Sequence, residues 1–382
     1  MSLSKFHAPE IVFGPGSLAE AGFAAARLGA RVPFVVTDPG IVEVGWTDEL
    51  LGHLADAGLR ASVWTEVTPN PKDHEIRAAH AAYVDCGADV IIAIGGGSVM
   101  DAAKGVAILA GNGGDILDYR GVDQMTNPIP PLMMIPSTSG TGADVSQFCI
   151  VTDTERSVKI TVMGRALVPD LSITDPRLLQ TMPEWLNAAT GLDALTHGIE
   201  SFVSLAHNPL ADLHAVSAVG LVSQHLRDTM ERPDDIDARR GMAEASLSAG
   251  LAFSNAILGA THAMSHQVGG LLDAPHGVIN GVLLPHVVRF NAAAAPERFL
   301  PLAHAFGLSR DETNASVAAD WLADRIRALA DQVGVPSGLK VLGVTEDNCR
   351  LLARTALDDA CLTTNPRFAD EDDLATLFKA AL

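Results

Sequence analysis

The feature that most restricts the fold is a change of pattern near residue 180. Before it, short apolar runs rich in β-branched residues alternate with Ala/Leu-rich helical stretches. The runs lie at residues 31–37, 61–67 and 88–94, and the helical stretches at residues 18–28 and 73–86. Such alternation is typical of a parallel sheet wrapped by helices. After Pro176 the strand signals almost vanish, so the sequence predicts an α/β domain over residues 1–180 and an all-α domain over residues 181–382.

Smaller signals add to this outline. Strands are expected at residues 131–135 and 171–174, and two β-branched runs around a polar turn predict a hairpin within residues 149–162. Thr181 and Glu184 are spaced as in a capping box, in which both side chains satisfy amides at a helix start. We therefore expect the second domain to begin with a helix at this point.

Composition limits the classes of function. The 382 residues carry 26 basic and 46 acidic side chains, which gives a formal charge of −20. That charge repels phosphate backbones and anionic headgroups, so neither nucleic acid nor a membrane surface is expected as a partner. The four cysteines include no CxxC pair, and the N-terminal sequence has no apolar run of signal-peptide length. We therefore expect a cytoplasmic protein that acts on small molecules.

Three glycines stand where a buried strand turns into a helix. Gly95–Gly97 and Ser98 connect an apolar β run to the helical stretch 99–104. Glycine allows a pyrophosphate to approach closely, and the free amides and dipole of a helix start favour its charge. The match to G-x-G-x-x-G fails at Met100, so the alternative is a tight turn without a ligand.

Two other segments are expected at the same edge of the sheet. The turn at residues 136–143, PSTSGTGA, follows a predicted strand and offers hydroxyls and free amides; the alternative is an ordinary polar loop. Ligands of open α/β sheets bind at the carboxyl edge, so the two loops support each other. Asp38 ends another strand, where a carboxylate can bind an adenosine ribose and repel a 2′-phosphate. A carboxylate at this position favours NAD over NADP. The alternative is that Asp38 is a plain turn residue.

Histidines and a carboxylate recur at helical spacing in the second half of the chain. Asp193 and His197 are four residues apart on a predicted helix, and His262 and His266 repeat this spacing on another. Each pair therefore lies on one helix face. For a single histidine the alternative is a hydrogen-bonded core residue. For the group, the Ala/Leu-rich surroundings make unpaired polar groups costly and indicate a shared site.

His276 completes a candidate metal site. The segment Asp273-Ala-Pro-His-Gly predicts a helix start capped by Asp273, which puts the imidazole in the first turn. The helix dipole there disfavours imidazolium, so His276 stays neutral and able to bind a cation. One carboxylate and up to four imidazoles suit Zn²⁺ or Fe²⁺ with a position open for substrate. Ala263 stands where an HExxH zinc protease has its glutamate, so hydrolysis by that route is not expected.

These motifs together resemble the iron-containing (group III) alcohol dehydrogenase family over nearly the whole chain. The residues that carry the resemblance are Gly-Gly-Gly-Ser-x-x-Asp-x-x-Lys at 95–104, Asp193 with His197, and His262 with His266 and His276. The resemblance implies a Rossmann-like dinucleotide-binding domain followed by a helical domain. The metal ligands that it implies are Asp193, His197, His262 and His276. The dinucleotide contacts that it implies are Gly96, Gly97, Ser98, Thr138 and Thr141, with Asp101 and Lys159.

The resemblance also implies the reaction. A small primary alcohol or diol and its aldehyde would be interconverted by hydride transfer, with NAD and Fe²⁺ as cofactors and NADP and Zn²⁺ as alternatives. His266 would lie near the nicotinamide instead of binding the metal. Because histidine side chains exchange protons near neutral pH, His266 is our candidate for moving the proton. Phe148, Phe253 and Cys361 are candidates for the substrate pocket, with a buried inert thiol as the alternative for Cys361. The family favours a homodimer or larger homo-oligomer.

Three other functions stay open on the sequence. A maleylacetate reductase would reduce a dicarboxylic keto acid, but such relatives do not keep the full metal set. A metal-dependent lyase resembling dehydroquinate synthase would gather Lys and Arg around its cleft, and residues 181–290 are poor in them. A non-catalytic metal-binding or scaffolding protein would have no need for two loops that suit a dinucleotide.

Overall fold

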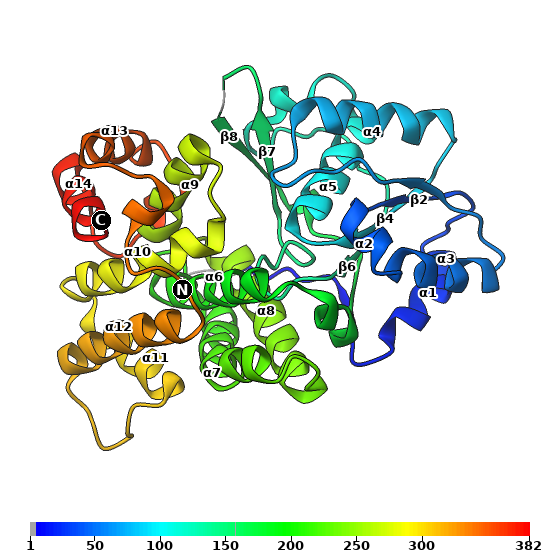
Figure 1. The fold of residues 1–382 in the computed structure, drawn as a ribbon. Coiled ribbons are helices and arrows are strands. Elements are labelled where there is room, and N and C mark those ends of the chain that lie inside the picture. The colour runs from blue at the N-terminus through cyan, green and yellow to red at the C-terminus, as the bar shows by residue number, and fades with distance from the viewer. Residues whose placement is uncertain (1–4, 157) are drawn as a thin grey trace. The chain divides into compact units, whose positions relative to one another are not determined.

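The computed structural model describes residues 5–156 and 158–382, and the chain forms two compact units. Residues 7–182 form one of them, which we call the sheet unit. Residues 183–382, with Lys5 and Phe6, form the other, which we call the helical unit. Figure 1 shows the strands in the first unit and helices throughout the second. A parallel α/β part followed by an all-helical part confirms the predicted fold class.

Six strands form the main sheet, in the order β1-β9-β6-β4-β2-β3. Their bounds are Glu10–Phe13 (β1), Pro33–Val36 (β2), Ser62–Trp64 (β3), Val90–Gly95 (β4), Leu132–Pro136 (β6) and Leu171–Thr174 (β9). All strand pairs in this sheet are parallel, so the carboxyl ends of the strands meet at one edge. The structure confirms the predicted strands with small shifts at their ends. The edge strand β1 was not predicted, because a short edge strand lacks a long buried run.

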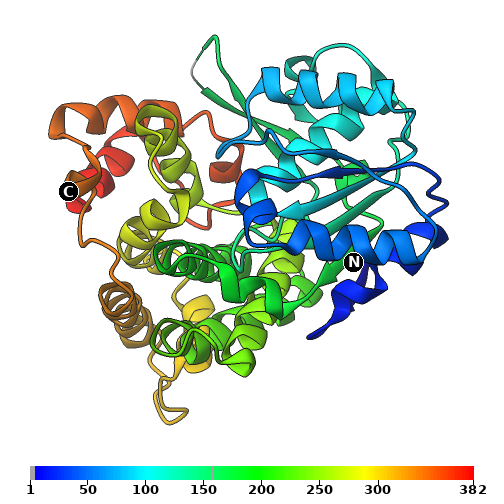
Figure 2. The same cartoon turned by 45° about the vertical axis from the view of Figure 1, so that its right-hand side comes forward.

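Helices cover both faces of this sheet (Figure 2). Val35 of β2 packs in one core with α1 and α3, whereas its neighbours Phe34 and Val36 pack in another with α4 and α5. This alternation follows from the two-residue period of a strand. The helix bounds are Ala21–Arg27 (α1), Pro39–Glu43 (α2), Trp46–Asp56 (α3), Asp73–Asp85 (α4) and Gly97–Asn112 (α5). The 3-10 helices of this unit are Ser17–Glu20 (η1), Ile116–Tyr119 (η2), Arg165–Leu167 (η3) and Pro176–Thr181 (η4).

A smaller sheet contains the predicted hairpin. Its strands are β5 (Gly121–Val122), β7 (Phe148–Asp153) and β8 (Val158–Met163), in the order β5-β8-β7. β7 and β8 pair antiparallel, which confirms the hairpin. The carboxylate of Asp153 accepts hydrogen bonds from the amides of Glu155 and Arg156, so it fixes the turn between the two strands.

The helical unit is built around α6. Its α-helices are Glu184–Val203 (α6), Pro209–Glu231 (α7), Ile236–Ala256 (α8), Ala260–Leu272 (α9), His276–Ala292 (α10), Phe299–Phe306 (α11), Ala315–Gln332 (α12), Glu346–Ala356 (α13) and Glu371–Ala380 (α14). The 3-10 helices are Pro296–Arg298 (η5), Leu339–Leu342 (η6) and Ala360–Thr364 (η7). Residues of α6, α7, α8, α9, α10 and α12 share one apolar core. Among the described residues, no helix has both the length and the apolar character that a membrane span requires.

The structure confirms a helix at each of these two points, but both predicted capping residues were wrong. α6 begins after Pro183, and the hydroxyl of Thr181 instead accepts a hydrogen bond from the indole nitrogen of Trp46 at 2.9 Å. Asp273 does not cap α10; it is the left-handed residue, with φ of 50°, that ends α9. Pro275 stands before α10, so His276 still lies in the first turn of that helix.

Candidate functional site

α6 carries polar side chains into the core of the helical unit. Every residue from Asn187 to Val203 on this helix is buried, so its polar groups need partners. Asp193, His197 and Glu200 follow one another at steps of four and three residues and therefore lie on one helix face. Sequence reasoning found the first two but overlooked Glu200, although the same spacing includes it.

Side chains from three helices meet at Asp193. Its Oδ1 atom lies 3.7 Å from Nε2 of His262 on α9 and 3.7 Å from Nε2 of His276 on α10. One ligand atom from each of these three residues lies within 4.8 Å of the others. The structure thus brings three of the four expected metal ligands into one tight group, which we call the Asp193 group.

His197 lies beside the Asp193 group. Its Nε2 atom is 3.9 Å from Asp193 Oδ1. Its ring stacks on His262, with ring centroids 4.6 Å apart, and on Phe253 of α8, with centroids 4.5 Å apart. The fourth expected ligand therefore borders the group, and Phe253, an expected pocket residue, covers its ring.

The Asp193 group favours positive charge. Burial alone would raise the pKa of Asp193, but the neighbouring charges of His197 and His262 bring it below its usual range. Burial alone would lower the pKa of His262, but the neighbouring carboxylates of Asp193 and Glu200 raise it to about 9. The histidines thus stabilise the ionised form of Asp193, and the two buried carboxylates stabilise positive charge on His262.

Asn280 lies one turn after His276 on α10 and was also overlooked. Its Nδ2 atom donates a hydrogen bond to Asp193 Oδ1 at 2.7 Å. Its buried Oδ1 atom has no hydrogen-bond partner among the described residues, which is rare for a buried acceptor. The same Nδ2 atom lies 3.3 Å from Nε2 of His262 and 3.2 Å from Nε2 of His276, so one carboxylate oxygen and two imidazole nitrogens surround one point. Such donors suit Zn²⁺ or Fe²⁺. The residues present therefore fit a divalent metal.

His266 lies next to the Asp193 group with a carboxylate partner of its own. Its Nδ1 atom is 2.9 Å from Oδ2 of Asp359, just before η7, and its ring stacks on His276 with centroids 5.3 Å apart. His266, Asp359 and Cys361 form a second group with ligand atoms within 4.8 Å of one another. Burial raises the pKa of the Cys361 thiol well above its usual value, so the thiol is protonated. Phe148, the remaining expected pocket residue, is on β7 of the sheet unit.

The two loops expected to hold the dinucleotide are in contact. β4 ends at Gly95, α5 begins at Gly97, and the amide of Ser137 donates to the carbonyl of Gly95 at 2.9 Å. A Cβ on Gly97 would lie 2.7 Å from the Cγ2 atom of Thr141, and one on Gly96 would lie 3.2 Å from that of Thr138. A side chain at either position would therefore press on the second loop, most strongly at Gly97. No described side chain caps α5, so its first amides suit an anionic group.

Asn70 links two of the other expected contacts and was missed as a site residue. Its amide donates to the hydroxyl of Ser98 at 3.1 Å, and its side-chain oxygen accepts from Lys159 at 2.8 Å. Its φ of 56° is tolerated by asparagine better than by most residues.

Asp101, another expected dinucleotide contact, is a buried carboxylate. Burial raises the pKa of Asp101 to about 7.

Asp38 lies at the same carboxyl edge of the sheet. Its side chain accepts a hydrogen bond from the amide of Ile41 at 3.1 Å and so caps α2. The adjacent Thr37 donates to the carbonyl of Ile94 at 2.9 Å, which holds the end of β2 against β4. The structure thus gives Asp38 the helix-capping role and places it just after β2, the strand that pairs with β4.

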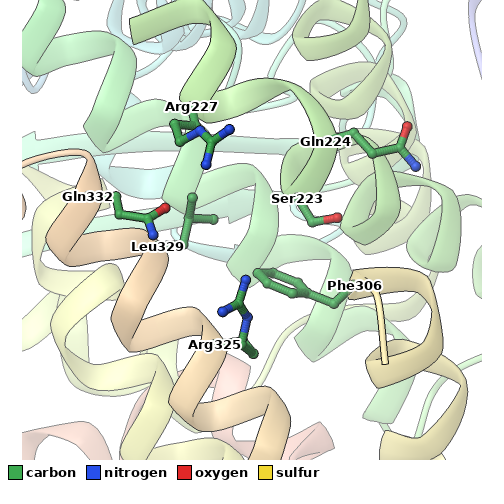
Figure 3. Close-up of a pocket in the computed structure, with 7 residues that line it drawn as sticks. All are labelled: Ser223, Gln224, Arg227, Phe306, Arg325, Leu329 and Gln332. Carbon is green, nitrogen blue, oxygen red and sulfur yellow. The ribbon is translucent and has the colours of Figure 1, made fainter. Parts of the chain in front are cut away.

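One cavity in the helical unit lies apart from these residues (Figure 3). It has a volume of about 160 Å³. Its lining residues are Ser223, Gln224, Arg227, Phe306, Arg325, Leu329 and Gln332, from α7, α11 and α12. It shares no residue with the Asp193 group or the second group, so we do not assign it to the candidate site.

Comparisons with known proteins agree with this arrangement. Residues 8–176 match the model for iron-containing alcohol dehydrogenases, and residues 187–382 match the C-terminal model of the same family. A 1,3-propanediol dehydrogenase from Citrobacter freundii is 40% identical over 97% of this chain and 96% of its own length. An NAD-dependent methanol dehydrogenase from Bacillus methanolicus is 36% identical over 99% of both chains. The structure of an alcohol dehydrogenase from Oenococcus oeni superposes over both whole chains with a TM-score of 0.97 and 36% identity.

Proposed function

The chain belongs to the iron-containing alcohol dehydrogenase family, and from this premise we propose its substrate class, cofactors and site residues. Among the functions left open by the sequence, its relatives support an NAD-dependent, metal-dependent alcohol oxidoreductase. We propose that it interconverts small primary alcohols or diols and their aldehydes. The relatives that act on 1,3-propanediol and methanol support this substrate class.

The observation that carries the proposal is the meeting of Asp193, His262 and His276 from three helices. When bound there, a divalent metal polarises the substrate oxygen, and the dinucleotide carries the hydride. Asp193 would supply the negative charge, and His262, His276 and His197 would supply neutral nitrogen ligands. Phe253 covers the ring of His197 and so shields that side from water. The donor set fits both Fe²⁺ and Zn²⁺, and the family favours iron.

Metal reconstitution tests this function. Metal-free protein would be loaded without oxygen with Fe²⁺ or with Zn²⁺ and assayed for NADH formation with primary alcohols and diols of increasing length. We expect activity only after loading, with iron giving the more active enzyme. Absence of NADH formation with every metal and alcohol would contradict the proposal.

We propose NAD as the preferred dinucleotide because Asp38 sits at the carboxyl edge beside the glycine loop. Asp38→Asn keeps an oxygen that can cap α2 but removes the negative charge. We expect kcat/KM with NADP, relative to NAD, to rise at least about tenfold, or about 1.4 kcal/mol. Initial rates with both dinucleotides measure this ratio. Asp48→Asn, at an exposed position on α3, is the control, and an unchanged ratio in Asp38→Asn would leave Asp38 as a helix cap only.

We propose that His266 moves the proton, with Asp359 holding its ring. His266→Ala should lower kcat about 100-fold, the usual size of general acid–base catalysis, while the bound metal stays at the wild-type level. Asp359→Asn weakens the bond to His266 Nδ1 and should have a smaller effect, about tenfold. Turnover rates and elemental analysis measure both quantities, with His304→Ala on α11 as the control. Loss of metal from His266→Ala would make it a ligand instead.

The family resemblance supports a homodimer or larger homo-oligomer, and the cysteine pattern supports a cytoplasmic location. Light scattering of the purified protein tests the first proposal, since a monomeric mass would contradict it. Fractionation of the cells that produce the protein tests the second.

A further inference from the structure

Glu200 is a fully enclosed carboxylate that faces the far side of His262. Its Oε2 atom lies 2.6 Å from Nδ1 of His262, and both side chains are buried. When Nδ1 carries the proton and donates it to this carboxylate, the lone pair of the ring is on Nε2. That nitrogen faces Asp193, with a distance of 3.7 Å to Oδ1. Glu200 thus selects the nitrogen of His262 that is presented to the metal.

Glu200 also holds the start of the helix that carries His262. Its carboxylate accepts hydrogen bonds from the amides of Thr261 at 2.6 Å and Gly259 at 3.1 Å, at the N-terminus of α9. A Cβ on Gly259 would lie 3.0 Å from Oε1 of Glu200, so only glycine leaves full room for the carboxylate. One side chain on α6 therefore fixes both the backbone of α9 and the ring orientation of its histidine.

We propose that Glu200 is a positioning residue of the metal centre, which fixes His262 as an Nε2 ligand. Histidine ligands in metalloproteins commonly donate their second N–H to a carboxylate, which orients the ring and strengthens its basicity. Asp193 and Glu200 then lie on one face of α6 and have different roles. Asp193 would bind the metal, and Glu200 would orient the ring of the ligand His262. The inference rests on the proposed metal site and extends it to a residue outside the ligand set.

Asn365 offers a matched control for a purely structural role. Its side-chain oxygen accepts a hydrogen bond from the amide of Ala260 at 3.1 Å, so it caps the same end of α9. It also exchanges hydrogen bonds with Asn291. None of its hydrogen bonds in the described structure reaches the ring of His262. Asn365→Ala therefore weakens the helix start and leaves the carboxylate–imidazole pair in place.

Zinc affinity of the full-length chain separates the two roles. Metal-free wild-type protein, Glu200→Gln and Asn365→Ala would be titrated with Zn²⁺ against a chromophoric chelator, and their melting temperatures measured without metal. We expect Glu200→Gln to bind Zn²⁺ about 10–100-fold more weakly. Asn365→Ala should melt at a lower temperature but bind Zn²⁺ as the wild type does. Wild-type affinity in Glu200→Gln, or equal losses in both variants, would overturn the inference.

A measurement on the wild type keeps the inference testable if Glu200→Gln does not fold. In zinc-loaded protein labelled with ¹⁵N-histidine, we expect NMR to show His262 protonated at Nδ1 and zinc bound at Nε2. Zinc at Nδ1 would overturn the inference. If the wild type binds no Zn²⁺ at all, the proposed metal site fails, whereas tight wild-type binding with an unaffected Glu200→Gln refutes only the role of Glu200.

Discussion

Replacing Asp193 by asparagine should leave the protein without bound metal and lower kcat/KM for alcohol oxidation at least about 1000-fold, or about 4 kcal/mol. Asp193 supplies a carboxylate oxygen that lies 3.7 Å from Nε2 of both His262 and His276. The amide that replaces it carries no charge, so the group loses its main attraction for a dication. Elemental analysis of the purified variant and NADH formation in the presence of added Fe²⁺ measure the two effects.

The control for this variant is Asp228→Asn. Asp228 lies on α7, where its carboxylate pairs with Arg232 at 3.0 Å on the surface. Surface pairs of this kind contribute little stability. Asp228→Asn should therefore keep both its metal and its activity. Full metal content in purified Asp193→Asn would contradict the assignment of Asp193 as a ligand.

Local sequence patterns were enough to predict most of the fold. β4 is buried along its whole length, and its continuous apolar run shows this directly in the sequence. The cap of α6 was predicted wrongly, because a capping box is a local pattern and the Thr181 hydroxyl accepts a hydrogen bond from Trp46 instead. The two residues are 135 positions apart, so nothing near Thr181 in the sequence could reveal this competing contact.

Helical spacing explains which site residues were predictable. The rule that paired Asp193 with His197 also covers Glu200 on α6, so this residue was within reach of sequence reasoning. Asp359 was not. It meets His266 across 93 positions of the chain, from a 3-10 segment with no periodic pattern of its own. Contacts of this kind depend on how distant segments pack, which a single sequence does not encode locally.

Gly277, directly after His276, is another residue whose role depends on the packing of distant segments. A Cβ at this position would lie 2.0 Å from the backbone oxygen of Ala189 on α6, far inside van der Waals contact. Gly277→Ala must therefore push the first turn of α10 away from α6 and move His276 from Asp193. We expect the free energy of unfolding to fall by about 3 kcal/mol, the upper range for overpacking. Zinc affinity should fall at least about tenfold, since the ligand geometry is lost.

Gly270→Ala on α9 is the matched control, because a Cβ there meets no atom within 4 Å. Alanine in an open helical position restricts the unfolded chain and stabilises a protein by about 0.4–1 kcal/mol. Urea unfolding of the metal-free proteins should therefore show Gly277→Ala to be less stable than the wild type and Gly270→Ala to be more stable. In zinc titrations, only Gly277→Ala should lose affinity. Equal stability of the two variants would show that α6 and α10 can separate freely. The close approach of these helices would then not be what holds His276 against Asp193.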